Sequence, residues 1–129
     1  MKQYGDRDAH IRSNVDELNR YLQFLSARMD PECAKVVIRD MAYAILADLK
    51  LNSPVVTGNL RGNWNLTEIA NAMAYHIYNN TEYIFHVEYG QAASAGFVRR
   101  TLEDWRLKAP EFIRSRIEAW IEKKRREAH

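Results

Sequence analysis

The side chains of this chain that most readily do chemistry are four histidines and one cysteine. The histidines, which fit neither a zinc-protease spacing nor a nucleophile motif, are His10, His76, His86 and His129. His86 and Glu88 lie two positions apart, so they share a face of a strand but not of a helix. Such a pair is typical of a surface or an interface. We therefore expect no catalysis by histidine.

The remaining candidates for chemistry also have simpler roles. Cys33 is the only cysteine, so it forms no internal disulfide and supplies no zinc site alone. It falls among apolar helix positions, which indicates a small buried side chain. Ser53 and Thr57 lie in a stretch without a hydrolase glycine elbow, and turn and capping roles suffice for both. The expectation is a non-enzymatic protein with no catalytic, cofactor-binding or metal-binding residue.

Composition places the chain among ordinary globular domains. Apolar residues make up 47% and charged residues 28% of 129 residues, enough to bury a core. No run of about 18 uncharged apolar residues occurs. The start, "MKQYGDRDAH", lacks the apolar stretch of a secretion signal. We expect a single domain over residues 1–129 with no membrane span.

Apolar residues at steps of three and four predict a first helix over residues 14–29. Its stripe consists of Val15, Leu18, Leu22, Leu25 and Met29. Tyr21 and Phe24 widen that stripe. The added width indicates either plain core or contact with a further neighbour, such as another subunit.

The clearest helix start in the sequence is at Asp30, a cap, followed by Pro31 at the first helical position. The apolar positions that follow keep helical spacing for about five turns. They are Cys33, Val36, Val37, Met41, Ala44, Ile45 and Leu49. We expect this segment to be the central core helix.

Alternation replaces helical spacing after Trp64. Trp64 and Leu66 fall on one side, and Met73, Tyr75 and Ile77 on another, which predicts two antiparallel strands joined near residues 69–71.

Residues 81–90, "TEYIFHVEYG", fit either a strand or a helical turn. Thr81 as a cap, with Glu82 beside it, favours a short helix.

Residues 90–96, "GQAASAG", have the composition of a mobile surface loop. Beyond it, apolar residues hold helical phase across Pro110, which predicts one long kinked helix or two nearly collinear ones. These residues are Phe97, Val98, Leu102, Trp105, Ala109, Phe112, Ile113, Ile117, Trp120 and Ile121. The predicted fold class is α+β, with helices packed on a small antiparallel sheet and a long C-terminal helix.

The end of the chain is basic, although the formal net charge of +2 is too small to mark the whole chain as a nucleic-acid binder. Ten Lys or Arg lie in residues 99–126, against six Asp or Glu in residues 103–127. A basic last turn complements the helix dipole and stays solvated, which explains most of this excess. Contact with nucleic acid is the alternative interpretation.

In chain order, the pieces are an amphipathic helix, "SPVVTGNLRGNW", a strand pair, "YNNTEYIFHVEYG", a small-residue loop and "GFVRRTLEDW". This order resembles the tail-completion or minor tail component family of long-tailed bacteriophages, which sits at the neck joining head to tail. The resemblance spans residues Val36 to Trp105.

Two signatures carry the resemblance. The first, Ser-Pro-x-x-Thr-Gly-x-Leu-Arg, is matched by Ser53, Pro54, Thr57, Gly58, Leu60 and Arg61. The second, Asn, then Tyr, then Val-Glu-x-Gly, is matched by Asn79, Tyr83, Val87, Glu88, Tyr89 and Gly90. The chain departs from the family at Ile84, where members often carry a small residue.

The resemblance implies a virion structural protein at the head–tail junction of a tailed phage or prophage, made in the host cytoplasm and acting in tail completion as a neck ring. Its implied partners are further copies of itself in a hexameric ring, head–tail connector proteins, and a tail terminator or tail tube protein. Contact with packaged DNA is a further possibility. The alternative is a small nucleic-acid-binding protein that uses the basic C-terminal helix.

The loop after the central helix is the main candidate site. Held by Pro54 and turned at Gly58, it would lock helix to sheet, with Glu88 as the partner of Arg61. The alternative is that it only makes a tight helix-to-strand turn. The structural and interface candidates are Pro54, Thr57, Gly58, Leu60, Arg61, Tyr83, Glu88, Gly90, Tyr21 and Phe24.

Overall fold

A computed structural model describes residues 16–25, 27–54, 59–69, 71, 74–81, 83–90 and 95–128, without the side chains of residues 59, 83, 85 and 86. A helix at residues 16–25 precedes α2 (Pro31–Asn52), α3 (Asn59–Gly62), β1 (Trp64–Ile69), β2 (Ala74–Asn79), α4 (Tyr83–Tyr89) and α5 (Phe97–Glu127). The two strands form one antiparallel sheet. The predicted α+β class, with a small sheet and a long C-terminal helix, is confirmed.

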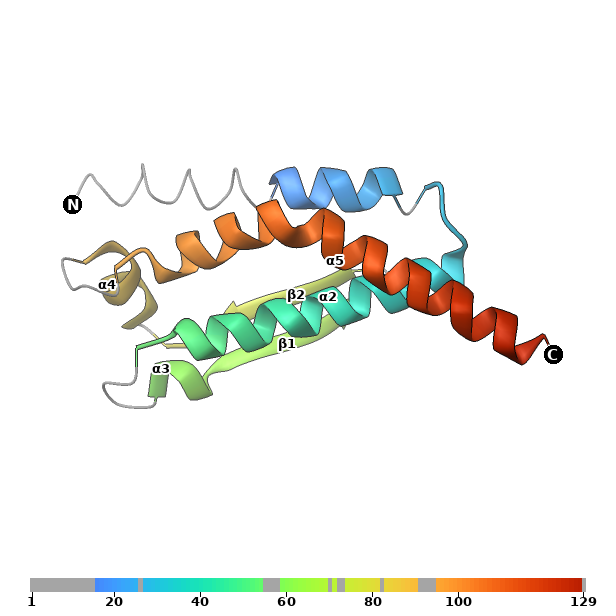
Figure 1. Cartoon of the computed structure of the whole chain (residues 1–129). Coiled ribbons are helices and arrows are strands. Elements are labelled where there is room, and N and C mark those ends of the chain that lie inside the picture. The colour runs from blue at the N-terminus through green and yellow to red at the C-terminus, as the bar shows by residue number, and fades with distance from the viewer. Residues whose placement is uncertain are drawn as a thin grey trace.

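Helix α2 begins where the sequence predicts. The Asp30 side chain accepts hydrogen bonds from the N–H groups of Glu32 and Cys33, at 2.8 and 3.4 Å, and Pro31 opens the helix. α2 packs against α5 on one side and against the hairpin on another (Figure 1). Its expected place as the central helix is therefore confirmed.

The larger apolar cluster joins α2, α5 and helix 16–25. Its buried members are Leu18, Cys33, Val37, Met41, Trp105, Ala109 and Ile113. Cys33 is 2% exposed, as predicted, and burial raises the pKa of its thiol, so the thiol stays protonated. Asp48 ties α2 to α5 by accepting hydrogen bonds from Trp105 Nε1, at 2.8 Å, and Lys108 Nζ, at 3.0 Å.

Helix 16–25 lies along α5 (Figure 1). An ion pair of 3.1 Å between Arg106 and Glu17 joins the two helices. Leu18 is buried, and partly buried side chains beside it fill the rest of the predicted stripe: Tyr21, Leu22, Leu25 and Met29. Residues 14 and 15 of the expected helix lie outside the described residues.

The hairpin register runs from Trp64 opposite Asn79 to Ile69 opposite Ala74. Leu66 lies opposite Ile77, and directly opposed residues share a face of a sheet. The apolar residues that the sequence placed on two sides therefore lie on one face, which packs on α2. Tyr43 of α2 contacts Tyr75 on this face, with ring centroids 6.4 Å apart. Met73 lies outside the described residues.

Helix α5 continues through Pro110 as one helix of 31 residues, which decides between the two predicted alternatives. Figure 1 shows it bending midway, and its C-terminal end reaches past the start of α2. Proline has no N–H to donate to the carbonyl of Arg106, four residues earlier. Because Pro110 and Arg106 are both exposed, that carbonyl lies toward water. None of the described helices combines the length and apolar content that a membrane crossing requires.

Removing residues 123–129 is expected to change the free energy of unfolding by less than about 0.5 kcal/mol. Side chains 123–128 are all exposed, and the ion pairs Lys124–Glu127 and Arg125–Glu122 lie at the surface. Circular dichroism and thermal melting of the truncated protein measure the effect. Truncation after Arg116 is the control, because it also removes Ile117 and Trp120, which pack on the core. Loss of most of the helical signal when only residues 123–129 are removed would show that this end is docked.

Candidate functional site

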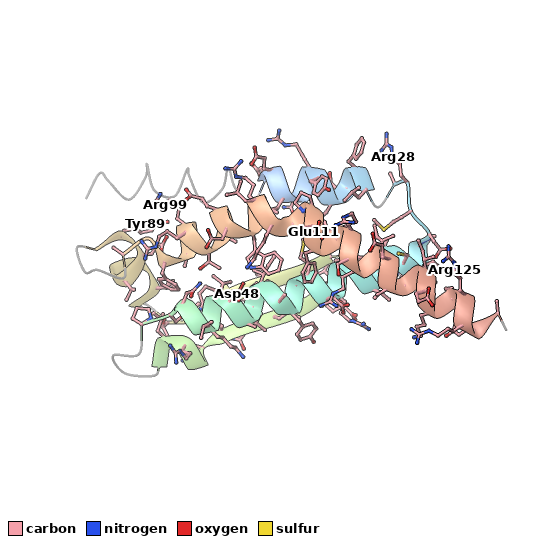
Figure 2. The ribbon with its side chains drawn as sticks, viewed as in Figure 1. Arg28, Asp48, Tyr89, Arg99, Glu111 and Arg125 are labelled. Carbon is pink, nitrogen blue, oxygen red and sulfur yellow. The ribbon has the colours of Figure 1, made fainter. Side chains whose placement is uncertain are left out.

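The two signature stretches meet at the end of the molecule where α2 stops and α5 begins. We call the cluster of Ser53, Leu60, Arg61, Trp64, Asn79 and Glu88 the signature junction. Figure 2 shows Tyr89 of α4 and Arg99 of α5 close together at this end, while Arg125 lies at the other. The junction thus joins segments from the end of α2 to the start of α5.

Ser53 links the end of α2 to the start of β1. Its hydroxyl donates to Leu49 O, at 2.6 Å, and accepts from Trp64 Nε1, at 2.7 Å. Both Ser53 and Trp64 are buried, so each bond replaces one to water at a site where an unpaired polar atom is costly. The first signature therefore starts with a structural hydroxyl rather than a reactive one.

Arg61 binds the C-terminal end of α2. Its Nη2 donates to Ser53 O, at 3.0 Å, and to Leu51 O, at 3.3 Å, where the last carbonyls of a helix lack intrahelical partners. Arg61 Nε is buried and has no hydrogen-bond partner among the described atoms. The expected pair with Glu88 is wrong, because each side chain is held by backbone groups at a different helix end.

Asn79 joins the two signatures directly. Its Nδ2 donates to Leu60 O, at 2.9 Å, so the second signature holds the loop of the first. Its Oδ1 accepts from the N–H and the hydroxyl of Thr81, at 2.9 and 2.7 Å. The helix expected after Thr81 is confirmed as α4. The Thr81 hydroxyl, however, donates its hydrogen back to Asn79.

Glu88 holds the start of α5. Its Oε1 accepts from Val98 N–H, at 2.8 Å, and its Oε2 from Arg99 N–H, at 2.9 Å. Its own carbonyl accepts from Gly96 N–H, at 2.8 Å. Gly96, the residue before α5, has a φ of +80° and no side chain with which to cap the helix. Glu88 therefore supplies the cap from another element.

The buried environment of Glu88 disfavours the charged form of its carboxyl. The residue is 3% exposed, and this burial raises the pKa of its carboxyl above the ordinary 4.5. The hydrogen bonds from the backbone of Arg99 and Val98, and the charges of Arg100 and Arg99, act in the opposite direction but more weakly.

A second apolar cluster includes Leu60 and Trp64 of the junction. Its buried members are Leu49, Leu60, Trp64 and Phe97. The Trp64 and Phe97 rings meet edge to face, with centroids 6.4 Å apart. Beside them, Asn52 Nδ2 donates to Thr101 Oγ1 at 2.9 Å, which joins the end of α2 to α5. The junction is thus both hydrogen-bonded and packed.

The structure brings most of the predicted site residues together, but not all. Leu60, Arg61 and Glu88 belong to the junction, Pro54 follows Ser53 and is half-buried, and Gly90 directly follows α4. Thr57 and Gly58 lie outside the described residues, as does the side chain of Tyr83.

Tyr21 and Phe24 lie on helix 16–25, and of the two only Tyr21 belongs to the other apolar cluster. Tyr21 is partly buried there. Phe24 is 55% exposed, with the Arg28 guanidinium 3.7 Å from its ring centroid. An exposed aromatic ring remains compatible with the predicted contact to a neighbour.

Sequence reasoning missed Trp64 Nε1, Thr101 and Gly96 as parts of the site. Gly96 carried a usable signal, since a glycine directly before a helix that has no Ser, Thr or Asp cap indicates that the cap comes from elsewhere. The prediction of a mobile surface loop over residues 90–96 is wrong at Gly96, which is buried and donates its N–H to Glu88 O. Residues 91–94 lie outside the described residues. Nothing local marked Thr101.

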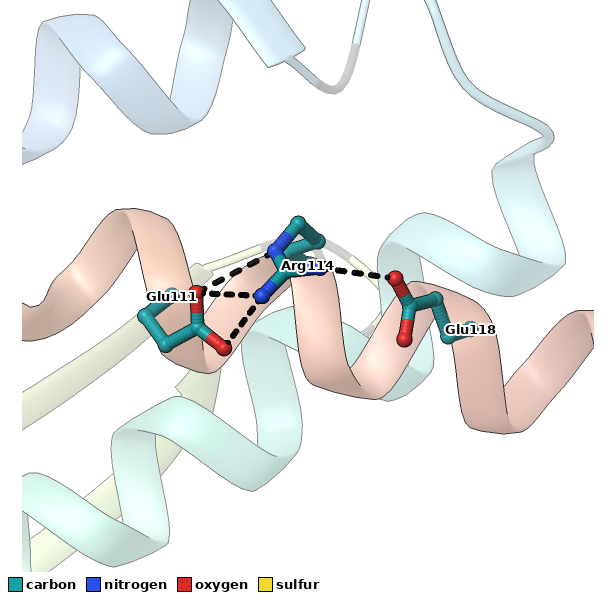
Figure 3. Close-up of polar contacts among 3 residues, drawn as sticks. All are labelled: Glu111, Arg114 and Glu118. Atoms are coloured by element: carbon teal, nitrogen blue, oxygen red, sulfur yellow. Dashed lines mark hydrogen bonds and ion pairs between the residues drawn. The ribbon is translucent and has the colours of Figure 1, made fainter.

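Most of the basic residues of α5 lie beside acids. In the described part of the chain, ion pairs involve seven of the ten: Arg99, Arg106, Lys108, Arg114, Arg116, Lys124 and Arg125. Figure 3 shows Arg114 between Glu111 and Glu118, which it reaches at 2.6 and 3.1 Å. The sequence excess of basic residues is thus not an unopposed positive face.

Arg61→Ala is expected to lower the free energy of unfolding by about 1–3 kcal/mol, because two carbonyls at the end of α2 lose a charged donor. Thermal and urea melts measure the loss. Arg61→Met keeps the apolar stem and separates packing from hydrogen bonding. Arg106→Ala, which removes a half-exposed ion pair, is the control and should cost about 0–1 kcal/mol. Wild-type melts for both Arg61 variants would show that the two bonds contribute nothing.

Comparison with protein families finds a match for most of the chain up to residue 90. The model described as "Bacteriophage HK97-gp10, putative tail-component" matches residues 16–90. That range contains helix 16–25, α2, the hairpin and α4, and therefore both signature stretches. Comparisons with curated proteins and with solved structures return no match.

Proposed function

Because the chain belongs to the HK97-gp10-like family of bacteriophage tail components, we propose that it is a non-enzymatic structural protein of the neck, acting in tail completion at the head–tail junction. The family match supports a structural component of the phage tail. The position at the neck rests on the family resemblance that the two signatures carry.

The observation that supports a structural role best is the signature junction. Residues of the two signatures hold α2, the hairpin, α4 and α5 in one arrangement, through Ser53, Asn79 and Glu88. A subunit that transmits contacts between head and tail needs elements fixed relative to one another. Hydrogen bonds that join these elements at a largely buried site provide such rigidity.

The assembled form in this proposal is a closed hexameric ring, coaxial with the tail. A head-to-tail interface repeated around an axis closes into a ring when its rotation fits the number of subunits. Phe24 and Tyr21 on helix 16–25, and the loop at residues 91–96, are the proposed contact surfaces. The neighbours are connector proteins on the head side and a tail terminator or tail tube protein on the other.

Electron cryomicroscopy of the assembled particle tests this proposal, with a matched preparation from a phage that lacks the gene. We expect sixfold density for this chain in the neck, and separate heads and tails in the deletion preparation. A single asymmetric copy, density elsewhere in the tail, or joined particles in the deletion preparation would contradict the neck assignment.

Nucleic-acid binding is the other candidate, and contact with packaged DNA would use the basic end of α5. The ion pairs along α5 argue against it as the main function. A cation that already pairs with an acidic side chain gains less binding free energy from a DNA phosphate. Binding of the isolated protein to duplex DNA, measured at several salt concentrations, separates the two. Tight binding that weakens steeply with salt would favour the nucleic-acid alternative.

A further inference from the structure

An apolar groove of about 460 Å³ lies between helix 16–25, α2, the hairpin and the start of α5. Five residues of α2 line it: Ile38, Met41, Ala42, Ile45 and Leu49. Helix 16–25 contributes Leu18, Asn19, Leu22 and Gln23, and α5 contributes Val98 and Leu102. None of the lining residues is an Asp, Glu, Lys or Arg. The groove therefore suits uncharged side chains.

One wall of the groove is the edge of β2. Four consecutive residues, 74–77, line it, whereas β1 contributes only Trp64. Consecutive strand residues point their side chains to opposite faces of the sheet. Four consecutive residues can therefore line the same groove only if the groove runs along the edge of the strand. β2 therefore presents backbone, as well as side chains, to the groove.

The hairpin ladder shows which backbone groups these are. The hydrogen bond from Asn80 N–H to Asn63 O continues the ladder one pair beyond the strands. Hydrogen-bonded and non-hydrogen-bonded pairs alternate in an antiparallel ladder. Tyr75 and Ile77 are thus in non-hydrogen-bonded pairs, and their N–H and C=O groups point away from β1. Their side chains lie on the face that packs against α2.

We propose that this groove receives an extended segment of another virion protein, which adds to β2 as a third strand. The backbone of the segment would pair with Tyr75 and Ile77, and its apolar side chains at every second position would lie on Ile45 and Ile38 of α2. Main-chain bonds give such strand addition its affinity, and pockets for alternate side chains give its specificity. A two-stranded sheet also gains stability from a third strand.

We assign the occupant to another protein because the groove has an uncharged lining that two nearer candidates do not fit. Residues 1–15, "MKQYGDRDAHIRSNV", carry five charged residues and no alternating apolar pattern. A second copy presents its own hairpin already covered by α2. A groove of about 460 Å³ holds several side chains but not a strand with its covering helix.

Amide hydrogen exchange, followed by NMR on the purified protein, tests the proposal. The probe is a short capped peptide of alternating valine and threonine. We expect exchange at Tyr75 and Ile77 to slow by about tenfold or more when the peptide pairs with them. His76 and Tyr78, whose N–H groups already point to β1, are internal controls and should change little.

The same peptide, N-methylated at alternate residues on its pairing edge, is the matched control. It keeps the apolar side chains, but its N-methyl groups remove the N–H donors and keep that edge from approaching β2 closely, so it should give no protection. Equal protection by both peptides would mean apolar binding without strand addition and would overturn the proposal, as would no protection by either. The proposal does not depend on a position at the neck, so its failure would leave the neck assignment standing.

Discussion

Replacing Trp64 with alanine is expected to lower the free energy of unfolding by about 3–5 kcal/mol, the largest effect of any single change in the signature junction. Trp64 is 8% exposed, packs edge to face on Phe97 and donates its indole N–H to Ser53. Alanine would leave a cavity where α2, β1 and α5 meet. Urea denaturation followed by circular dichroism measures the loss.

Two further variants divide that loss into its parts. Trp64→Phe keeps most of the ring packing and removes the bond to Ser53, so it should cost about 1–2 kcal/mol. Trp120→Ala is the control, because Trp120 is only partly buried in the other apolar cluster. A loss below about 1 kcal/mol for Trp64→Ala, or an equal loss at both tryptophans, would mean that the junction does not hold the fold.

Those parts of the fold that rest on local signals could be predicted from the sequence. Asp30 and Pro31 specify the start of α2 because capping geometry involves only neighbouring residues. Helical phase across Pro110 specified α5, since an exposed proline bends a helix without ending it when the flanking turns are packed. The face of the hairpin was assigned less well, because alternation locates a buried side of each strand but not the register between strands.

The site was predictable in its membership but not in its contacts. Two short signatures contain Leu60, Arg61 and Glu88, which the structure brings to one junction. The pairing of Arg61 with Glu88 was wrong because opposite charge was the only available criterion. Backbone groups at helix ends compete for the same side chains, and the sequence does not show which helix end lies near which residue. The groove beside β2 could not be predicted, because it depends on how three helices and the hairpin pack.

Glu88→Ala is expected to lower the free energy of unfolding by about 2–3 kcal/mol at neutral pH. The change leaves the N–H groups of Val98 and Arg99 without their acceptors at the start of α5. Glu103→Ala is the matched control, because Glu103 only pairs with Arg99 at the partly exposed surface and should cost about 0–1 kcal/mol. An equal, small effect of both changes would show that α5 needs no cap from α4.

The carboxyl of Glu88 also makes the free energy of unfolding depend on pH. The direction of that dependence tests whether burial or hydrogen bonding dominates its environment. Burial raises the folded-state pKa of Glu88 above the ordinary 4.5, so between the two values the folded protein binds more protons than the unfolded chain. The part of the free energy of unfolding that depends on this titration is therefore fully present below pH 4.5 and is lost as the pH rises through the folded-state pKa, whereas the two backbone hydrogen bonds remain at neutral pH. Glu88→Gln removes this titration, so the stability of the wild type relative to Glu88→Gln should fall as the pH rises through that window. Urea denaturation of both proteins at a series of pH values measures the difference, in which contributions from the other carboxyls cancel. A relative stability that rises with pH would mean that the two backbone hydrogen bonds outweigh burial, and that the cap is strongest in its charged form.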